Sequence, residues 1–310
     1  MTLSLKGIIP PVITPLINNR ELDTKGLTQL IRHLIDGGVH GLFVLGTTGE
    51  GPGLGYKIRK ELIKRVCDQV DHQIPVLVGV TDTSFENTLS IAEYAREQGA
   101  DAAVIAPPYY FPISDGEMMG YIEHLSDALP LPFVMYNMPS HTKMHLSLSV
   151  IERCRELGAL GIKDSSGDAA YCYSLIDKFK DYPEFSVITG TELYLPETVL
   201  YGGHGAVAGG ANIFPRLFVA LYDAAVNHDL DTINTLREHL IKIENTIYNV
   251  DQNPSRYIKS IKCAVSVLGI CNDYVVHPHR KFTGLQRQQI EIAVKTLLDE
   301  IKITVRPCNL

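Results

Sequence analysis

Residues 75–106 read PVLVGVTDTSFENTLSIAEYAREQGADAAVIA, and this stretch decides the fold class. It begins with a short apolar run at 75–80, continues with an amphipathic run from Ser84 to Gln98, and ends with a second apolar run at 102–106. The short apolar runs predict buried strands of a parallel sheet, and the amphipathic run between them predicts a helix. The stretch is therefore typical of a βαβ unit.

The same alternation extends to about residue 227, and we count eight pairs of a strand and a helix. Strands are predicted at 8–13, 41–45, 75–80, 102–106, 132–136, 159–163, 186–189 and 205–208; among the helices that follow them are 23–35, 56–70, 84–98 and 115–128. Eight such pairs predict an α/β fold, and they fit a closed (β/α)₈ TIM barrel better than an open doubly wound sheet, which remains the alternative.

The pattern changes near residue 228, after which amphipathic helices follow one another without strands. We predict a barrel catalytic domain over residues 1–227 and a C-terminal helical annex over residues 228–310. The annex helices are expected at 231–249, 254–268 and 285–303. Residues that favour helix N-caps stand before several predicted helices of the chain, namely Asp23, Ser84, Ser114 and Ser147.

The composition excludes several classes of protein. With 45% hydrophobic and 20% charged residues the chain resembles an ordinary globular protein, and no apolar run reaches the ~18 residues of a membrane span. A formal charge of −7 without a basic run argues against nucleic acid or an anionic membrane as a partner. The first ten residues do not form a signal peptide, so we expect a cytoplasmic protein.

The chain shows no sign of a disulfide framework or a metal site. Its six cysteines, at positions 67, 154, 172, 263, 271 and 308, include no C-x-x-C pair. Several of them lie in apolar patterns, where a free thiol behaves as a small hydrophobic group. The histidines at 141, 204, 277 and 279 lack the spacing of metal ligands. We therefore predict no metal.

A lysine, Lys163, ends the apolar strand at 159–163. An ammonium in such a place is poorly hydrated, so its pKa should fall and its neutral amine should be favoured. A neutral amine can attack a carbonyl carbon and form a Schiff base. The alternative is a structural lysine that extends to water or pairs with Asp164.

In a barrel the carboxyl ends of the strands meet at one mouth, and five of the predicted strand ends carry polar or glycine-rich groups. They are the turn at 46–51, the Pro-Pro-Tyr-Tyr segment at 107–110, Tyr136 with Asn137, Lys163, and residues 190–192. This convergence favours the catalytic interpretation of Lys163.

Each group has a chemical and a structural interpretation. Hydroxyls and backbone N–H groups of the turn at 46–51 could hold a carboxylate, or the turn could simply cap the next helix. The Tyr136 phenol could relay protons beside Lys163, or it could make a core hydrogen bond. Tyr109 and Tyr110, held in a proline-rich loop, could contact another subunit or only solvent.

Taken together, these segments resemble the dihydrodipicolinate synthase / N-acetylneuraminate lyase family of class I pyruvate-dependent aldolases. The resemblance covers most of the chain and rests on five motifs in the family's order and spacing: GTTGE at 46–50, PYY at 108–110, YNMP at 136–139, GIKD at 161–164 and GGHG at 202–205. It implies a (β/α)₈ barrel with a C-terminal helical segment, a homotetramer built as a dimer of dimers, and no metal or organic cofactor.

The resemblance also implies roles for the catalytic residues. Lys163 would form the Schiff base with pyruvate or another 2-oxo acid, and Tyr136 would transfer protons. Thr47 and Thr48 would hold the substrate carboxylate. Tyr110 would extend toward the site of a neighbouring subunit, where Thr47 would connect the two phenols.

Further substrate contacts are implied at four positions. Gly190 and Val207 match strand ends whose backbone lines the pocket, and Ser165 and Glu192 match contacts to hydroxyls of sugar acids in the lyase branch. Position 141 departs from the synthases, which carry an arginine there for a distal carboxylate. His141 has no bidentate fork and is often neutral at pH 7, so it would bind a carboxylate more weakly.

We therefore predict a lyase of the class I aldolase type that cleaves a 2-oxo acid into pyruvate and an aldehyde, or condenses the two. A 2-keto-3-deoxy sugar acid or a related 4-hydroxy-2-oxo acid is the expected substrate. The alternatives are dihydrodipicolinate synthase or a 2-keto acid dehydratase that uses the same lysine imine. A non-catalytic binding protein on the same barrel is a further alternative.

Overall fold

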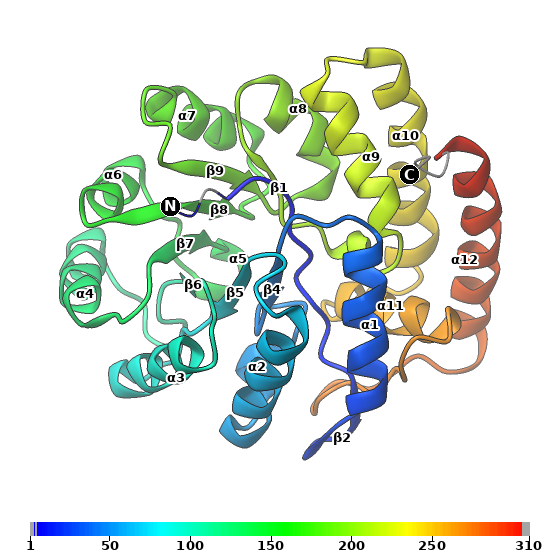
Figure 1. The fold of residues 1–310 in the computed structure, drawn as a ribbon, viewed down its shortest axis with the longest axis horizontal. Coiled ribbons are helices and arrows are strands. Elements are labelled where there is room, and N and C mark those ends of the chain that lie inside the picture. The colour runs from blue at the N-terminus through cyan, green and yellow to red at the C-terminus, as the bar shows by residue number, and fades with distance from the viewer. Residues whose placement is uncertain (1–2, 4, 306–310) are drawn as a thin grey trace.

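The computed structural model describes residue 3 and residues 5–305, and it contains a parallel eight-stranded sheet that closes on itself (Figure 1). The strands lie in the order β1 (Gly7–Ile8), β10 (Gly205–Ala206), β9 (Ser186–Thr189), β8 (Ala159–Asp164), β7 (Phe133–Asn137), β6 (Ala102–Ile105), β5 (Val76–Gly79) and β4 (Leu42–Val44). A parallel bridge between Pro11 and Phe43 joins the first segment to β4. The predicted (β/α)₈ barrel is confirmed.

The first strand is shorter than predicted. The sequence predicts a strand at 8–13, but the pairing with β10 ends at Ile8. On its other side the segment pairs with β4 only through the single bridge at Pro11. Pro10 and Pro11 lack an N–H, so they cannot donate to a ladder. The segment continues into a small hairpin of β2 (Leu16–Asn18) and β3 (Glu21–Leu22) that the sequence pattern did not indicate.

Helices surround the sheet (Figure 1). They are α1 (Thr24–Asp36), α2 (Tyr56–Val70), α3 (Phe85–Glu97), α4 (Asp115–Ala128), α5 (Pro139–Thr142), α6 (Leu148–Glu156), α7 (Ala169–Phe179), α8 (Leu195–Leu200) and α9 (Pro215–Val226), with short 3₁₀ segments η1 (Gly51–Gly53), η2 (Glu192–Tyr194) and η3 (Gly209–Asn212). The predicted N-caps at Asp23, Ser84, Ser114 and Ser147 are confirmed, since each side chain accepts a hydrogen bond from the backbone N–H three residues later.

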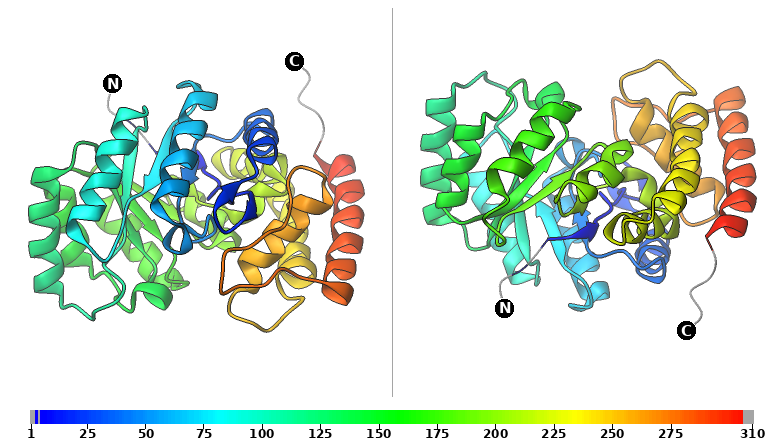
Figure 2. Two further views of the ribbon diagram at one scale, coloured as in Figure 1. Left: turned by 90° about the horizontal axis from the view of Figure 1, so that it is seen from below. Right: turned by 90° about the horizontal axis from the view of Figure 1, so that it is seen from above.

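The C-terminal segment packs beside the barrel as α10 (Leu230–Ile243), the π-helical turn η4 (Glu244–Tyr248), α11 (Arg256–Val267) and α12 (Gly284–Thr304) (Figures 1 and 2). One helix was predicted over 231–249, and its last turn is the π-helical η4. The hydrophobic cluster between the sheet and its helices continues into the annex through Ile233, Ile261 and Ile290. The predicted domain boundary at residues 227 and 228 remains a prediction.

A second, smaller apolar cluster fills the inside of the barrel. It includes Phe43, Leu77, Val134 and Ile188 and reaches Tyr136 near the carboxyl ends of the strands. Inward side chains from several strands pack there, as expected for a filled barrel, so an open site can form only above them, at the mouth.

Within the described residues, no helix combines the length and the apolar character needed to cross a membrane. The same part of the chain contains no cluster of metal-binding side chains. Its five cysteines carry free thiols, and Cys308 lies outside the described residues.

Candidate active site

Lys163 and Tyr136 stand beside each other at the mouth of the barrel. They are the penultimate residues of neighbouring strands and are directly paired in the register of β8 with β7. The Lys163 Nζ atom lies 3.9 Å from the centroid of the Tyr136 ring and 5.1 Å from that of Phe43. Only 6% of Lys163 is exposed, so this lysine does not extend to water.

The surroundings of Lys163 favour its neutral amine. Burial lowers the pKa of Lys163, and the adjacent Tyr136 only partly opposes that effect. Asp164 does not neutralise it, because the Asp164 carboxylate accepts hydrogen bonds from Asn137 Nδ2 at 2.8 Å and Ser166 Oγ at 2.9 Å. Neither structural alternative for this lysine, exposure or pairing with Asp164, describes its position.

The Thr47 hydroxyl connects the turn after β4 to the phenol. Thr47 Oγ1 lies 3.2 Å from the Tyr136 hydroxyl oxygen, within hydrogen-bonding distance. Thr48 is buried, and only Thr47 of the pair lines the cavity described below. The structure therefore brings the predicted residues Lys163, Tyr136 and Thr47 together.

The turn that carries these threonines is closely packed and strained. Two non-glycine residues, Leu45 (φ 59°) and Glu50 (φ 57°), adopt the left-handed conformation at its two ends. A Cβ atom on Gly51 would lie 2.1 Å from the carbonyl oxygen of Leu45, so no larger residue fits there. Strain of this kind persists only where surrounding contacts hold the backbone.

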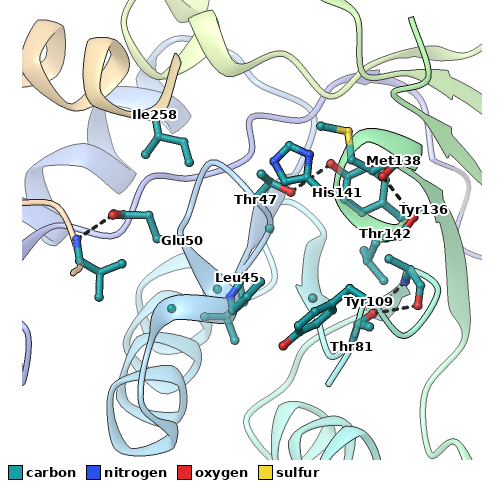
Figure 3. Close-up of a pocket in the computed structure, with 18 of the residues that line it drawn as sticks. Leu45, Thr47, Glu50, Thr81, Tyr109, Tyr136, Met138, His141, Thr142 and Ile258 are labelled. Carbon is teal, nitrogen blue, oxygen red and sulfur yellow. Dashed lines mark hydrogen bonds between the residues drawn. The ribbon is translucent and has the colours of Figure 1, made fainter. Parts of the chain in front are cut away.

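A cavity of about 310 Å³ opens above Tyr136 (Figure 3). Thr47, Tyr109 and His141 line it on the barrel side. Its opposite wall comes from the annex, through Ile258 of α11 and the segment at 276–279. Tyr136 and Thr47 therefore face a space shared by barrel and annex.

Lys163 itself borders a much smaller space of about 10 Å³ below this cavity. Phe43 and Val104 line both spaces, and the Tyr136 ring lies over the amine. A bound ketone in the cavity would therefore meet the amine beside the Tyr136 ring, and the flexible stem of the lysine supplies the reach.

Three of the other predicted contacts cluster around Lys163. A Cβ atom on Gly190 would lie 1.9 Å from Ser165 Oγ and 3.0 Å from Lys163 Cε, so the absence of a side chain at Gly190 makes room for both. Val207 borders the same small space as the lysine. Their contacts with substrate remain predictions.

Tyr110 is separated from this group. It is 69% exposed, and its ring lies edge-on to that of Phe111, which is also exposed. Its neighbour Tyr109, not Tyr110, lines the cavity. The predicted role of Tyr110 at a neighbouring subunit's site remains a prediction.

Glu192 points toward the annex. It is buried, its Oε2 accepts a hydrogen bond of 2.9 Å from the Gly210 N–H, and it does not line the cavity. Burial raises the pKa of Glu192 to about 7, although the Gly210 N–H opposes this shift. The charge of Glu192 in turn contributes to the raised pKa of Tyr248 in η4. Its predicted contact with substrate hydroxyls remains a prediction.

This buried carboxyl group should make stability depend on pH. Between the ordinary pKa near 4.5 and about 7, the folded protein keeps a proton that the unfolded chain has lost, so the free energy of unfolding falls as pH rises. Glu192→Gln removes this titration. We expect the variant to exceed the wild type by about 1 to 3 kcal/mol above pH 7, with little difference near pH 5. Urea unfolding at the two pH values measures it, and an equal difference at both would contradict the assignment.

The sequence pattern placed Asn137 at a strand end but gave it no role. Its Oδ1 accepts a hydrogen bond from the Leu146 N–H, just before α6, and its Nδ2 donates one to Asp164. Other groups around the site were not indicated by the sequence pattern. Arg59 lies at the cavity edge, but its guanidinium is paired with Asp82 at 3.1 Å. The sequence pattern also did not indicate that the annex forms one wall of the cavity. A lysine on the apolar face of α11, Lys262, was the one sequence signal that pointed to a buried charge there.

Comparison with known proteins places the chain in a family. A model of the Dihydrodipicolinate synthetase family matches residues 4–297. The chain belongs to this family. It is accordingly a lyase of the class I aldolase type, as predicted. The additional resemblance to N-acetylneuraminate lyases remains a prediction.

Relatives within the family differ in the substrates that their names give. A dihydrodipicolinate synthase structure from Bacteroides thetaiotaomicron is 48% identical with a TM-score of 0.92, over 96% of this chain and all (100%) of that one. YagE of Escherichia coli, named as a candidate 2-dehydro-3-deoxy-D-gluconate aldolase, is 32% identical over 96% of this chain and 97% of its own. Its structure in complex with pyruvate has a TM-score of 0.89, is 30% identical, and covers 95% of this chain and 99% of that one.

Proposed function

We propose that this family member splits a 4-hydroxy-2-oxo acid into pyruvate and an aldehyde, or condenses the two, through an imine on Lys163. The observation that carries the proposal is a buried lysine with a lowered pKa, next to a tyrosine whose hydroxyl reaches Thr47. The complex of the relative YagE with pyruvate supports the choice of pyruvate.

Imine chemistry assigns a task to each group. The Lys163 amine adds to the C2 ketone, and Tyr136 gives its proton to the hydroxyl that leaves as water. The protonated imine accepts the electron pair of the C3–C4 bond as it breaks. The proton of the C4 hydroxyl passes to Tyr136 as the aldehyde forms. Tyr136 then gives that proton to C3 of the enamine. Water adds to the resulting imine and returns a proton to Tyr136, which releases pyruvate and the Lys163 amine.

The turn that carries Thr47 and Thr48 is the proposed site of the substrate carboxylate. Closely spaced N–H groups and hydroxyls bind such an anion without a cation. The nearby guanidinium of Arg59 is already neutralised by Asp82, so it is not available for this task. A carboxylate held in the turn would place its adjacent C2 near Lys163.

A hydroxylated chain suits the distal part of the cavity better than a second carboxylate. His141 lines the cavity, and burial lowers its pKa. A neutral imidazole donates and accepts single hydrogen bonds, as hydroxyls require, but offers no fork to a carboxylate. Sugar-derived acids are therefore the favoured class. We propose that Ser165, whose Oγ lies close to Gly190 as Lys163 does, contacts their hydroxyls.

The 48% identical Bacteroides structure favours a second candidate, dihydrodipicolinate synthase, with the same imine. The assembly is proposed to be a homotetramer in the cytoplasm. Exposed Tyr110 and Phe111 support contact with a second copy of the chain, because two adjacent aromatic side chains at 69% and 73% exposure leave a large apolar surface uncovered.

A panel of 2-oxo acids tests the substrate class. We expect pyruvate release from 2-keto-3-deoxy sugar acids, because the imine drives C3–C4 cleavage whenever C4 carries a hydroxyl. Lactate dehydrogenase with NADH measures the pyruvate. Consumption of pyruvate with aspartate semialdehyde, without release from any sugar acid, would contradict this proposal and support the synthase.

A further inference from the structure

A buried ion pair connects the active-site turn to the annex. Glu50 ends the turn after β4, and Lys262 lies on α11, 212 residues later in the chain. The side chain of Lys262 is 0% exposed and that of Glu50 is 1% exposed. Few charges in a protein are this fully removed from water.

Two further hydrogen bonds fix the pair. Glu50 Oε1 accepts a 2.8 Å bond from the Val276 N–H. Figure 3 draws a hydrogen bond of the labelled Glu50 side chain as a dashed line. Lys262 Nζ donates a 2.7 Å bond to the carbonyl oxygen of Tyr274. Both partners therefore lie in the annex segment that runs toward the cavity wall.

Overall stability does not explain this arrangement. Removing two charges from water costs about as much free energy as their attraction returns, and apolar replacements are often equally stable. Burial lowers the pKa of Lys262, while Glu50 opposes that shift. The position of the pair, rather than its net free energy, is the feature to explain.

The pair lies where the turn needs support. Glu50 holds a left-handed backbone conformation, and its N–H donates a 2.9 Å hydrogen bond to the carbonyl oxygen of Thr47. Thr47 in turn reaches the Tyr136 hydroxyl at 3.2 Å. A shift of the Glu50 side chain would therefore move the backbone that carries both threonines.

The same helix also shapes the cavity. Ile258, one turn before Lys262 on α11, lines the wall opposite Tyr136 (Figure 3). A displacement of α11 would change both the wall and the turn. Because Glu50 is anchored to this helix, the turn and the cavity wall are held at a fixed distance from each other.

We propose that Lys262 is a positioning residue, which holds Glu50 and thereby keeps the turn at 46–50 in the conformation that binds the substrate carboxylate. The annex is then a part of the active site and not only a cover for the barrel. This inference rests on the proposed function, because it assigns the turn to the carboxylate of pyruvate.

The double variant Lys262→Met/Glu50→Gln tests it. Both charges are removed and the Val276 N–H keeps its acceptor, so the chain should fold, with a Tm lowered by the loss of the Lys262 bond to Tyr274. Borohydride trapping is measured with pyruvate and with acetone, a ketone that has no carboxylate. We expect trapping of pyruvate to fall about 10-fold or more relative to acetone, and KM for the substrate to rise more than kcat falls.

Lys259→Met is the matched control on the same helix. Lys259 pairs with Asp251 inside the annex, away from the turn, so its loss should lower Tm and leave the pyruvate to acetone ratio unchanged. If the double variant does not fold, the ratio of pyruvate to acetone trapping is measured on Glu50→Gln alone, and a fall in that ratio is then the expected result.

If the double variant kept the wild-type ratio of pyruvate to acetone trapping, the inference would be overturned. This holds even if its Tm were lowered, because only stability would then depend on the ion pair. Loss of trapping for both ketones to the same extent would also overturn it. If the wild-type protein formed no adduct with pyruvate, the proposed function would be refuted. If the wild type formed the adduct but the variants kept its ratio of pyruvate to acetone trapping, only the role of Lys262 would be refuted.

Discussion

Lys163→Met should lower kcat/KM for pyruvate release by at least about 10⁴-fold, which is the usual effect of removing a covalent nucleophile. Methionine has a similar length and fits the apolar surroundings of Phe43 and Tyr136, but its thioether cannot form an imine. Within the described residues no lysine lines the cavity, and Lys163 is the one lysine that borders the small space below it, so no neighbour can take over the reaction. A coupled assay of pyruvate release measures the loss.

Stability separates loss of chemistry from loss of fold in this variant. The pKa of Lys163 is lowered in the folded protein, so the folded state binds fewer protons than the unfolded chain and the lysine lowers stability below pH 10.5. Methionine removes that penalty, so Tm at pH 7 should equal or exceed that of the wild type. Turnover within 10-fold of wild type, in a folded variant, would exclude Lys163 as the nucleophile.

Tyr136→Phe should reduce turnover by about 10²- to 10⁴-fold, the usual contribution of a positioned acid–base group. The ring remains over Lys163 and keeps its edge-on contact with Phe43, whose centroid lies 6.3 Å away, so the fold should be unaffected. Only the hydroxyl that meets Thr47 is lost. Steady-state kinetics of pyruvate release, with Tm as a check on folding, measure this effect.

Tyr171→Phe provides a control for this experiment. The Tyr171 hydroxyl donates a 2.6 Å hydrogen bond to the carbonyl oxygen of Leu146, outside the cavity. Its loss should lower Tm and leave turnover close to normal. Equal turnover losses in the two variants, or near-normal turnover in Tyr136→Phe, would show that the Tyr136 hydroxyl does not carry the proton.

The barrel could be predicted because its signals are local. Each βα unit combines an apolar run with an amphipathic helix, and caps such as Ser114 accept bonds from residues only three positions away. The first strand was predicted too long because apolar character at 8–13 did not reflect the missing donors of Pro10 and Pro11. The hairpin at 16–22 has strands too short for a periodic pattern.

The core of the site could also be predicted, because parallel strands bring their carboxyl ends together. Lys163 and Tyr136 lie next to the carboxyl ends of adjacent strands, so their meeting follows from the fold. The direction in which the Glu192 side chain points could not be predicted from the strand order, because it depends on annex residues such as Tyr248. The bond between Glu50 and Val276 joins residues 226 positions apart, and no periodicity in the sequence encodes such a contact.

The most direct test of the account is to identify the atom that captures pyruvate. The protein is treated with pyruvate and sodium borohydride, and its peptides are mapped by mass spectrometry. We expect one reduced pyruvate adduct per chain, on the peptide that contains Lys163. No adduct, or an adduct on another lysine such as Lys262, would contradict the account.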